Sequence, residues 1–172
     1  MIRFLTKEDA LNKELMITLV ENINKNYSET ESEFWNDGVQ RTSVSEFKNE
    51  IENSKVIAYF EKGAIVGSLN YTYSSDEGKF SMLSINLDQH GQGIGGHLFR
   101  FMLNDLRQHN VKFLHLELLI PRNYVSDNKK WIYNWYQKNG FVKGKVHKAE
   151  ELDFIPHQNL KIESDFIEMT KE

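Results

Sequence analysis

Two kinds of hydrophobic spacing divide this chain into predicted strands and predicted helices. Runs in which apolar and polar residues alternate predict strands, and apolar residues three or four positions apart predict amphipathic helices. Strands are expected at residues 2–5, 56–61, 64–73, 80–87, 112–119, 141–148 and 160–170. Helices are expected at 7–23, at 43–51, from the glycines at 91–96 to residue 106, and at 126–139. This order indicates an α+β fold with a mixed, mostly antiparallel central sheet of about seven strands, flanked by about four helices.

Length and composition limit the class of protein. The 172 residues, 40% hydrophobic and 27% charged, predict a single globular domain spanning 1–172. A net charge of −4 argues against a nucleic-acid partner. The absence of cysteine excludes disulfides, thiolate metal sites and a cysteine nucleophile, and we expect no metal. No apolar run approaches the ~20 residues that span a bilayer, and acidic residues appear by Glu8, so we expect a cytoplasmic protein without a membrane partner.

One stretch, residues 83–99, contains more glycines than a simple turn between two elements would need. An alternating strand is followed by a turn rich in glycine and then by apolar residues at helical spacing. The glycines are Gly91, Gly93, Gly95 and Gly96. Glycine loses the most backbone entropy on folding, so four of them suggest that a ligand approaches the backbone here. The first turn of a helix offers free N–H groups and a positive dipole end, which suit a phosphate or pyrophosphate.

Three interpretations of this loop are open. The glycines contain Gly-x-Gly-x-x-Gly, the dinucleotide fingerprint, and Glu117 follows about 20 residues later, where such folds place a ribose-binding acid. However, residues 88–90 separate the strand from the glycines, and the strand alternates instead of being apolar on both faces. A turn with incidental glycines is the simplest interpretation.

The third interpretation rests on two motifs. The first is Leu83-Ser-Ile85 on a strand, followed by His90-Gly-Gln-Gly93-Ile-Gly95 at the start of a helix. The second is Trp135-Tyr136-Gln-Lys-Asn-Gly140-Phe141. Together they resemble the signature of the GNAT superfamily of acetyl-CoA-dependent N-acetyltransferases, with His90 in place of the usual Arg or Gln. The resemblance covers roughly residues 55–150, and the N-terminal third carries no motif.

This resemblance implies a binding site for acetyl-CoA. Backbone N–H groups of the glycine loop would hold the pyrophosphate, and the strand at 83–85, splayed from the strand at 112–119, would bind the pantetheine amides. His90 would add a side-chain contact or be an exposed turn residue. The family's helix asparagine falls on Lys129, so Asn128 is one position away from it. The implied contacts are Leu83, Ser84, Ile85, His90, Gly91, Gln92, Gly93, Ile94, Gly95, Gly96 and Asn128.

The resemblance also implies catalytic roles. A backbone N–H near Ile85 would stabilise the oxyanion, and Tyr136 would donate a proton to the CoA thiolate. A thiol pKa of ~8.5 against ~10 for tyrosine makes that transfer uphill by about 2 kcal/mol. Tyr136 therefore either has a lowered pKa or only hydrogen-bonds the thiolate; alternatively it is an aromatic core residue. Glu117 is a candidate base whose pKa burial would raise, or a charge on a solvent-facing strand.

The predicted function is transfer of an acetyl group from acetyl-CoA to a primary amine of a small molecule by direct attack. The alternative is a non-catalytic CoA-binding or regulatory domain of the same fold, and a homodimer is left open. The resemblance also implies that the acceptor site is walled by the segment between the first two helices, here residues 24–42, and by the last hairpin loop, here about 149–160. Their acids adjoin aromatic residues and predict a cationic amine, unless they are solvated surface charges. The acids are Glu29, Glu31, Glu33, Asp37, Glu150, Glu151 and Asp153.

Overall fold

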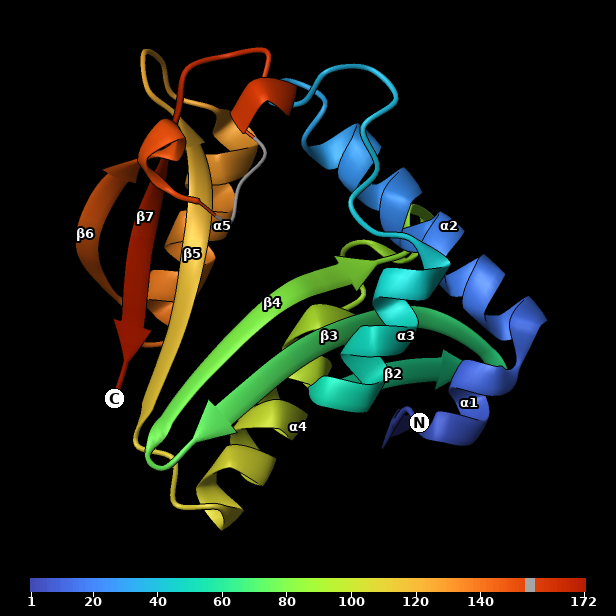
Figure 1. Ribbon diagram of the computed structural model, residues 1–172. Coiled ribbons are helices and arrows are strands. Elements are labelled where there is room, and N and C mark those ends of the chain that lie inside the picture. Colours follow the sequence, from blue (N-terminus) through green and yellow to red (C-terminus); the bar gives the residue numbers. More distant parts are fainter. Residues whose placement is uncertain (154–156) are drawn as a thin grey trace.

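A seven-stranded sheet in the order β1-β2-β3-β4-β5-β7-β6 forms the centre of the protein (Figure 1). The computed structural model describes residues 1–153 and 157–172. The strands are β1 (Ile2–Phe4), β2 (Lys55–Glu61), β3 (Ala64–Ser74), β4 (Glu77–Ile85), β5 (Phe113–Pro121), β6 (Val142–Lys148) and β7 (Ser164–Lys171). β4 and β5 pair in parallel, and the other neighbouring pairs are antiparallel. The predicted α+β class with a mostly antiparallel sheet is therefore confirmed.

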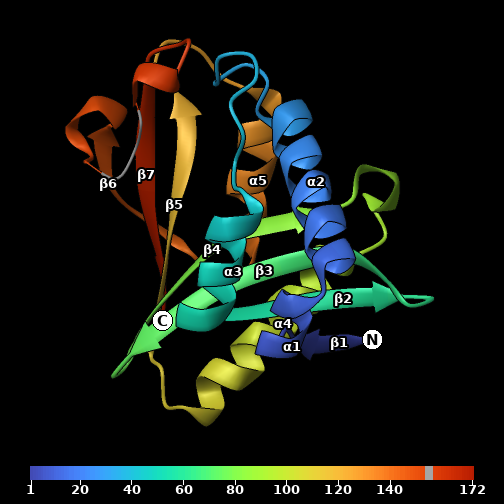
Figure 2. The same ribbon diagram turned by 45° about the vertical axis from the view of Figure 1, so that its right-hand side comes forward.

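Helices cover both faces of this sheet (Figure 2). They are α1 (Lys7–Leu11), α2 (Lys13–Thr30), α3 (Val44–Asn53), α4 (Ile94–Gln108) and α5 (Asp127–Lys138). α1, α2 and α3 pack on one face, in a cluster that includes Met16, Phe47 and Val56. α4 and α5 lie on the other face, where Phe99 of α4 contacts Trp135 of α5. None of the helices in the described residues is long and apolar enough to cross a membrane.

The predicted helix at 7–23 is two helices, because Asn12 interrupts it. Asn12 is both the C-cap of α1 and the N-cap of α2. Its side-chain oxygen accepts a hydrogen bond from the N–H of Leu15 at 3.1 Å. Asparagine is among the strongest N-cap residues, so it favours a new helix start over continuation of the first. The described residues therefore contain five α-helices where the sequence predicted about four.

β4 and β5 separate shortly after they begin to pair. Their parallel register covers only Glu77–Lys79 against Phe113–His115 among the described residues, and beyond it the two strands diverge (Figure 1). The opposite edge of β4 stays paired with β3, with a bulge between Ser68 and Asn70. Met82, within the bulge, has a φ of 53°, a left-handed conformation that is unusual for a residue with a side chain. The splay that the GNAT resemblance implied is therefore present.

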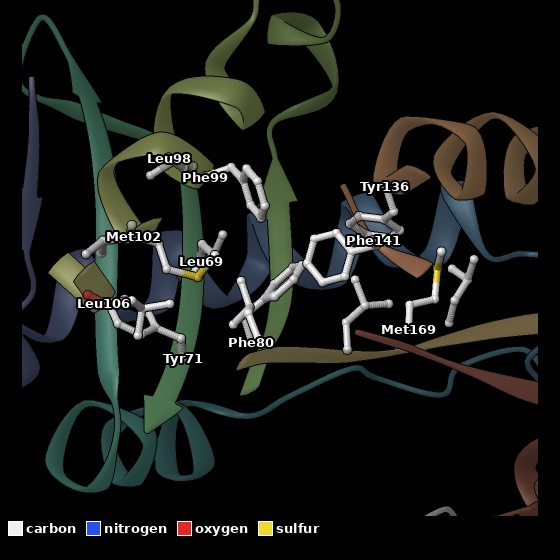
Figure 3. Close-up of a cluster of buried hydrophobic side chains, with 14 of the residues drawn as sticks. Leu69, Tyr71, Phe80, Leu98, Phe99, Met102, Leu106, Tyr136, Phe141 and Met169 are labelled. Carbon is white, nitrogen blue, oxygen red and sulfur yellow. The ribbon is translucent and has the colours of Figure 1, made fainter. Parts of the chain in front are cut away.

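Aromatic packing fills the space behind the diverging strands (Figure 3). The Phe80 ring centroid is 5.8 Å from those of Phe99 and Tyr136 and 5.9 Å from that of Phe141. These residues come from β4, α4, α5 and the turn before β6, and all are buried. Burying such rings stabilises the fold. Their bulk also keeps β5, β7 and β6 apart from the end of β4. The separation of β4 from β5 is thus maintained by buried side chains of the core.

Candidate active site

A cleft of about 1180 Å³ opens where β4 leaves β5. Its walls come from the end of α2, the segment 35–41, β4, the glycine loop, β5 and α5. The cleft brings together most of the residues predicted as a site, including Leu83, Glu117, Asn128 and Tyr136. The others are Ile85, His90, Gly91, Gly93, Ile94, Gly95 and Gly96. Two predicted residues do not line it in the described structure: Ser84 is buried and pairs with Ser68 of β3, and Gln92 is exposed.

The glycines of the loop are needed for different reasons. Gly91 and Gly93 have φ values of 79° and 78°, which side chains disfavour, and Gly93 is the N-cap of α4. Gly95 has no such conformation, and a Cβ built there would lie 4.0 Å from its nearest described neighbour, Ile85 Cγ1. Neither backbone nor packing explains a glycine at position 95. Close approach of a ligand to the first turn of α4 would explain it.

The side chain of His90 is hydrogen-bonded to other residues of the protein. Its Nε2 lies 2.9 Å from the carbonyl oxygen of Ile85 and 3.1 Å from Oδ1 of Asn26. Both partners are acceptors, so Nε2 carries the hydrogen. The ring therefore ties the loop to the end of β4 and to α2, although the residue is exposed as one alternative expected. A phosphate contact by His90 stays a prediction.

Tyr136 is both a core residue and a cleft residue. It is 6% exposed and packs edge-on against Phe80, Trp135 and Phe141. Burial, helped by the neighbouring Tyr27 and by the charge of Glu31, raises its pKa well above the ordinary tyrosine value. Of the alternatives left open by the sequence, a lowered Tyr136 pKa is therefore ruled out, whereas the packing of its ring in the core is confirmed. The phenol therefore keeps its proton throughout the physiological pH range.

Glu117 lies on β5 close to the point where the strands separate. Its Oε2 is 2.9 Å from Nζ of Lys79, and its side chain is 25% exposed. On its other side β5 pairs with β7, where Glu168 is directly opposite. The carboxylate is thus half-buried and ion-paired, which neither sequence-based alternative described. Its role as a base stays a prediction.

An ion pair that the sequence analysis missed lies in the wall of the cleft. Lys129, at the position of the family's asparagine, is 6% exposed, and its Nζ is 2.5 Å from Oε1 of Glu31. The same Nζ lies 4.9 Å from the centre of the Phe34 ring, and Glu31 Oε2 accepts the Trp35 Nε1 hydrogen at 2.8 Å. Asn128, the predicted contact, donates to the Thr30 carbonyl at 3.0 Å. A lysine two turns before Tyr136, on the buried face of a helix, could have signalled an acidic partner.

Several of the acidic residues that were predicted to wall the acceptor site are bound to other side chains of the protein. Glu33 accepts hydrogen bonds from Tyr124 and Ser126, and neither Glu33 nor Glu29 lines the cleft in the described residues. Asp37 does line it, with Lys161 Nζ at 3.9 Å. Arg122 binds Glu150 at 2.8 Å. Glu151 and Asp153 are exposed, and residues 154–156 lie outside the described residues. The cleft is also lined by the cations Arg41, Lys79, Lys129 and Lys161, so it has no single sign of charge.

Comparisons with known proteins match this geometry. The family model of the Acetyltransferase (GNAT) domain matches residues 23–164. The chain therefore belongs to the GNAT acetyltransferase family and is an acyltransferase of this type. A comparison with curated proteins gave no match.

Solved structures show the same fold over the whole chain. The PaiA N-acetyltransferase of Thermoplasma acidophilum, in complex with coenzyme A, is 18% identical with a TM-score of 0.72, over 100% of this chain and 98% of that one. Smu.2055 of Streptococcus mutans UA159 gives the same four values. A ribosomal-protein-alanine N-acetyltransferase of Brucella melitensis is 18% identical with a TM-score of 0.69, over 99% of this chain and 98% of its own.

Proposed function

We propose that this protein transfers the acetyl group of acetyl-CoA to a primary amine of a small molecule by direct attack. The observation that carries the proposal is the edge of β4 from Phe80 to Ile85, which leaves β5 and faces the cleft. An extended ligand with amide groups binds such an edge by main-chain hydrogen bonds, as an added strand does. The pantetheine arm of CoA has two amides and the length of a short strand.

The first turn of α4 supports the diphosphate end of the same ligand. It begins at Gly93 without a side-chain cap among the described residues, so its N–H groups are available to an anion. Gly95 leaves that turn open toward the cleft. The PaiA N-acetyltransferase was solved with coenzyme A, and the same fold here supports a CoA ligand for this chain.

In the reaction the amine nitrogen attacks the acetyl carbonyl carbon. Negative charge then develops on the carbonyl oxygen, and N–H groups of the β4 bulge near Ile85 would stabilise it. When the C–S bond breaks, Tyr136 donates its proton to the sulfur. Because the raised pKa of Tyr136 makes full transfer uphill by more than the ordinary ~2 kcal/mol, the phenol first donates a hydrogen bond to the forming thiolate, and the transfer is completed only when another proton restores the phenol.

The acceptor is proposed to be a small cationic amine. Glu31, Asp37 and Trp35 all line the cleft, and an ammonium group would be attracted by the two carboxylates and the indole. Lys161 lies 3.9 Å from Asp37, and Arg41 also lines the cleft, over the ring of Tyr27; these positive side chains weaken the attraction. A cation preference is therefore expected to be modest.

Two departures from the family motifs favour a second candidate, a CoA-binding domain without catalysis. His90 replaces the usual Arg or Gln of the loop, and Lys129 replaces the helix asparagine. Calorimetry with acetyl-CoA, followed by release of free CoA thiol with a panel of amines, separates the two. Binding with amine-dependent thiol release supports the enzyme, and binding without release on any amine supports the second candidate. Absence of acetyl-CoA binding would contradict both.

A further inference from the structure

The Glu31–Lys129 ion pair has little explanation in stability alone. Their side chains are 13% and 7% exposed, so both charges are largely removed from water. The cost of removing two charges from water often cancels their attraction, and apolar replacements are frequently as stable. A buried pair in the wall of an otherwise open cleft is therefore more readily explained by chemistry at that site.

The position of Glu31 relates it to both sides of the cleft. It follows Tyr27 by about one helical turn, with its N–H bound to the Tyr27 carbonyl at 2.9 Å. The Tyr27 hydroxyl lies 3.5 Å from the carbonyl of Leu83, on the free part of β4. Through Lys129 the carboxylate is held against α5, whose buried residues are Lys129 and Tyr136. Glu31 thus lines the cleft between α2, which contacts β4 through Tyr27, and α5, which carries the proposed acid.

The carboxylate has capacity for a further donor. Two carboxylate oxygens offer about four acceptor positions. Lys129 Nζ occupies one on Oε1 and Trp35 Nε1 occupies one on Oε2. The rigid indole and the buried ammonium fix the plane of the carboxylate. The remaining acceptor positions suit an incoming ammonium group.

We propose that Glu31 accepts the proton of the acceptor ammonium and that Lys129 is the positioning residue that orients it. This inference rests on the proposed acetyl transfer. The ammonium gives one proton to Glu31, and the freed lone pair forms the C–N bond. The C–S bond breaks, and the thiolate takes the proton of Tyr136. The second nitrogen proton then leaves to water, and the proton on Glu31 returns to the Tyr136 phenolate, so the catalytic groups are restored.

Other titratable groups face this carboxylate or the same cleft and must be separated from it in any pH experiment. Tyr27 and Tyr136 are neutral phenols with raised pKa values. Glu117 is paired with Lys79 on β5 and is the competing candidate. The remaining groups that line the cleft are Asp37, Arg41, Glu46, His90 and Lys161.

The test compares Glu31→Gln with the double variant Glu31→Gln/Lys129→Asn, which contains no unpaired buried lysine. Each is assayed with two acceptor amines of similar size, one with a pKa near 10 and one with a pKa below the assay pH. With the basic amine, kcat/KM is expected to fall about 100-fold or more in both variants, while acetyl-CoA affinity stays within about twofold. With the weakly basic amine, which is already neutral, the deficit is expected to shrink to a few-fold.

Glu33→Gln is the matched control, because Glu33 also bonds to the start of α5 but does not line the cleft in the described residues. It should keep wild-type kcat/KM with both amines. Equal deficits with the two amines, or recovery of activity when Lys129→Asn is added, would show that Glu31 only balances a buried charge. Loss of activity in Glu117→Gln but not in Glu31→Gln would assign the base to Glu117. Wild-type protein that binds acetyl-CoA but releases no thiol would overturn the acetyl transfer itself, and this inference with it.

Discussion

The ring of Phe80 lies edge-on to the ring of Tyr136, with the centroids 5.8 Å apart and the planes at 65°. Phe80 is the first residue of β4 beyond its pairing with β5, and Tyr136 lines the cleft from α5. A buried edge-to-face pair contributes about 0.5–1.5 kcal/mol beyond the area that it buries. The packing that keeps the two strands apart therefore also fixes the phenol that we propose as the proton donor.

Tyr136→Phe tests that role, because it keeps the ring packing and removes only the hydroxyl. We expect kcat to fall about 10- to 1000-fold, within the range of a single acid–base group, with little change in acetyl-CoA affinity. Because burial raises the Tyr136 pKa, wild-type kcat should show no loss from its ionisation up to pH 9. Steady-state kinetics over pH 6–9 and calorimetry provide both measurements. A kcat within twofold of wild type would make Tyr136 a purely structural residue.

Gly95→Val tests the approach of the cofactor to α4. Gly95 needs neither an unusual φ nor extra space, so valine should reduce acetyl-CoA affinity at least 100-fold while stability changes by about 1 kcal/mol or less. Gly93→Val should also prevent binding. However, the φ of Gly93 is 78°, so valine there would strain the backbone, and a loss of binding could then result from a loss of stability. Asn104→Val, at an exposed position of the same helix, controls for valine in a helix. Unchanged affinity in Gly95→Val would remove the basis for the pyrophosphate site.

Asp9 should give a pH-dependent contribution to stability. Its carboxylate binds both terminal nitrogens of Arg3, at 2.7 and 2.8 Å, and accepts the Thr6 N–H of the α1 cap. The bond from Arg3 is the main cause that lowers the Asp9 pKa to about 2. The folded-state pKa lies below the unfolded value of about 4, so this stabilisation is present above pH 4 and is lost as the pH falls toward 2.

Asp9→Asn should therefore lower the free energy of unfolding by about 1–2 kcal/mol at pH 7 and by almost nothing near pH 2. Urea unfolding at pH 7 and at the lowest pH where the protein stays folded measures the difference. Glu8→Gln, an exposed neighbour, is the control and should change little at either pH. An equal loss at both pH values would mean that charge is not the cause.

Local patterns predicted the elements of this fold but not all of their ends. The β7 strand was expected from residue 160, yet Leu160 bridges Trp35 instead, and Lys161 N–H bonds the Phe34 carbonyl at 2.8 Å. Strand β4 begins at Glu77, three residues earlier than predicted, because Ser74 and Glu77 pair across a tight turn. In both cases a pairing with another segment decided the boundary, and hydrophobic periodicity contains no information about that partner.

The candidate site shows the same division. The glycine loop and Tyr136 could be found from the sequence because each belongs to a short motif. The Glu31–Lys129 pair joins residues 98 positions apart, and nothing local to either residue identifies the other. For Glu33 the sequence predicted a role that the structure does not support. Its acidic neighbours suggested that it walls the acceptor site, but its carboxylate accepts hydrogen bonds from Tyr124 and Ser126. Charge composition of a segment does not tell which acids face a cleft.

Salt dependence tests whether the remaining acids select the acceptor. Asp37 is exposed at the cleft and the Glu31 side chain is only 13% exposed in its wall, so only the attraction by Asp37 should be strongly screened. A cationic diamine should exceed a neutral-tailed monoamine in kcat/KM at about 0.01 M salt, and the ratio should shrink at about 0.15 M, where the Debye length falls to about 8 Å. Asp37→Asn should reduce the ratio at low salt to about its high-salt value, while Glu29→Gln, outside the cleft, should leave it unchanged. An anionic best acceptor, or a cation preference that salt does not alter, would show that Asp37 is only a surface charge.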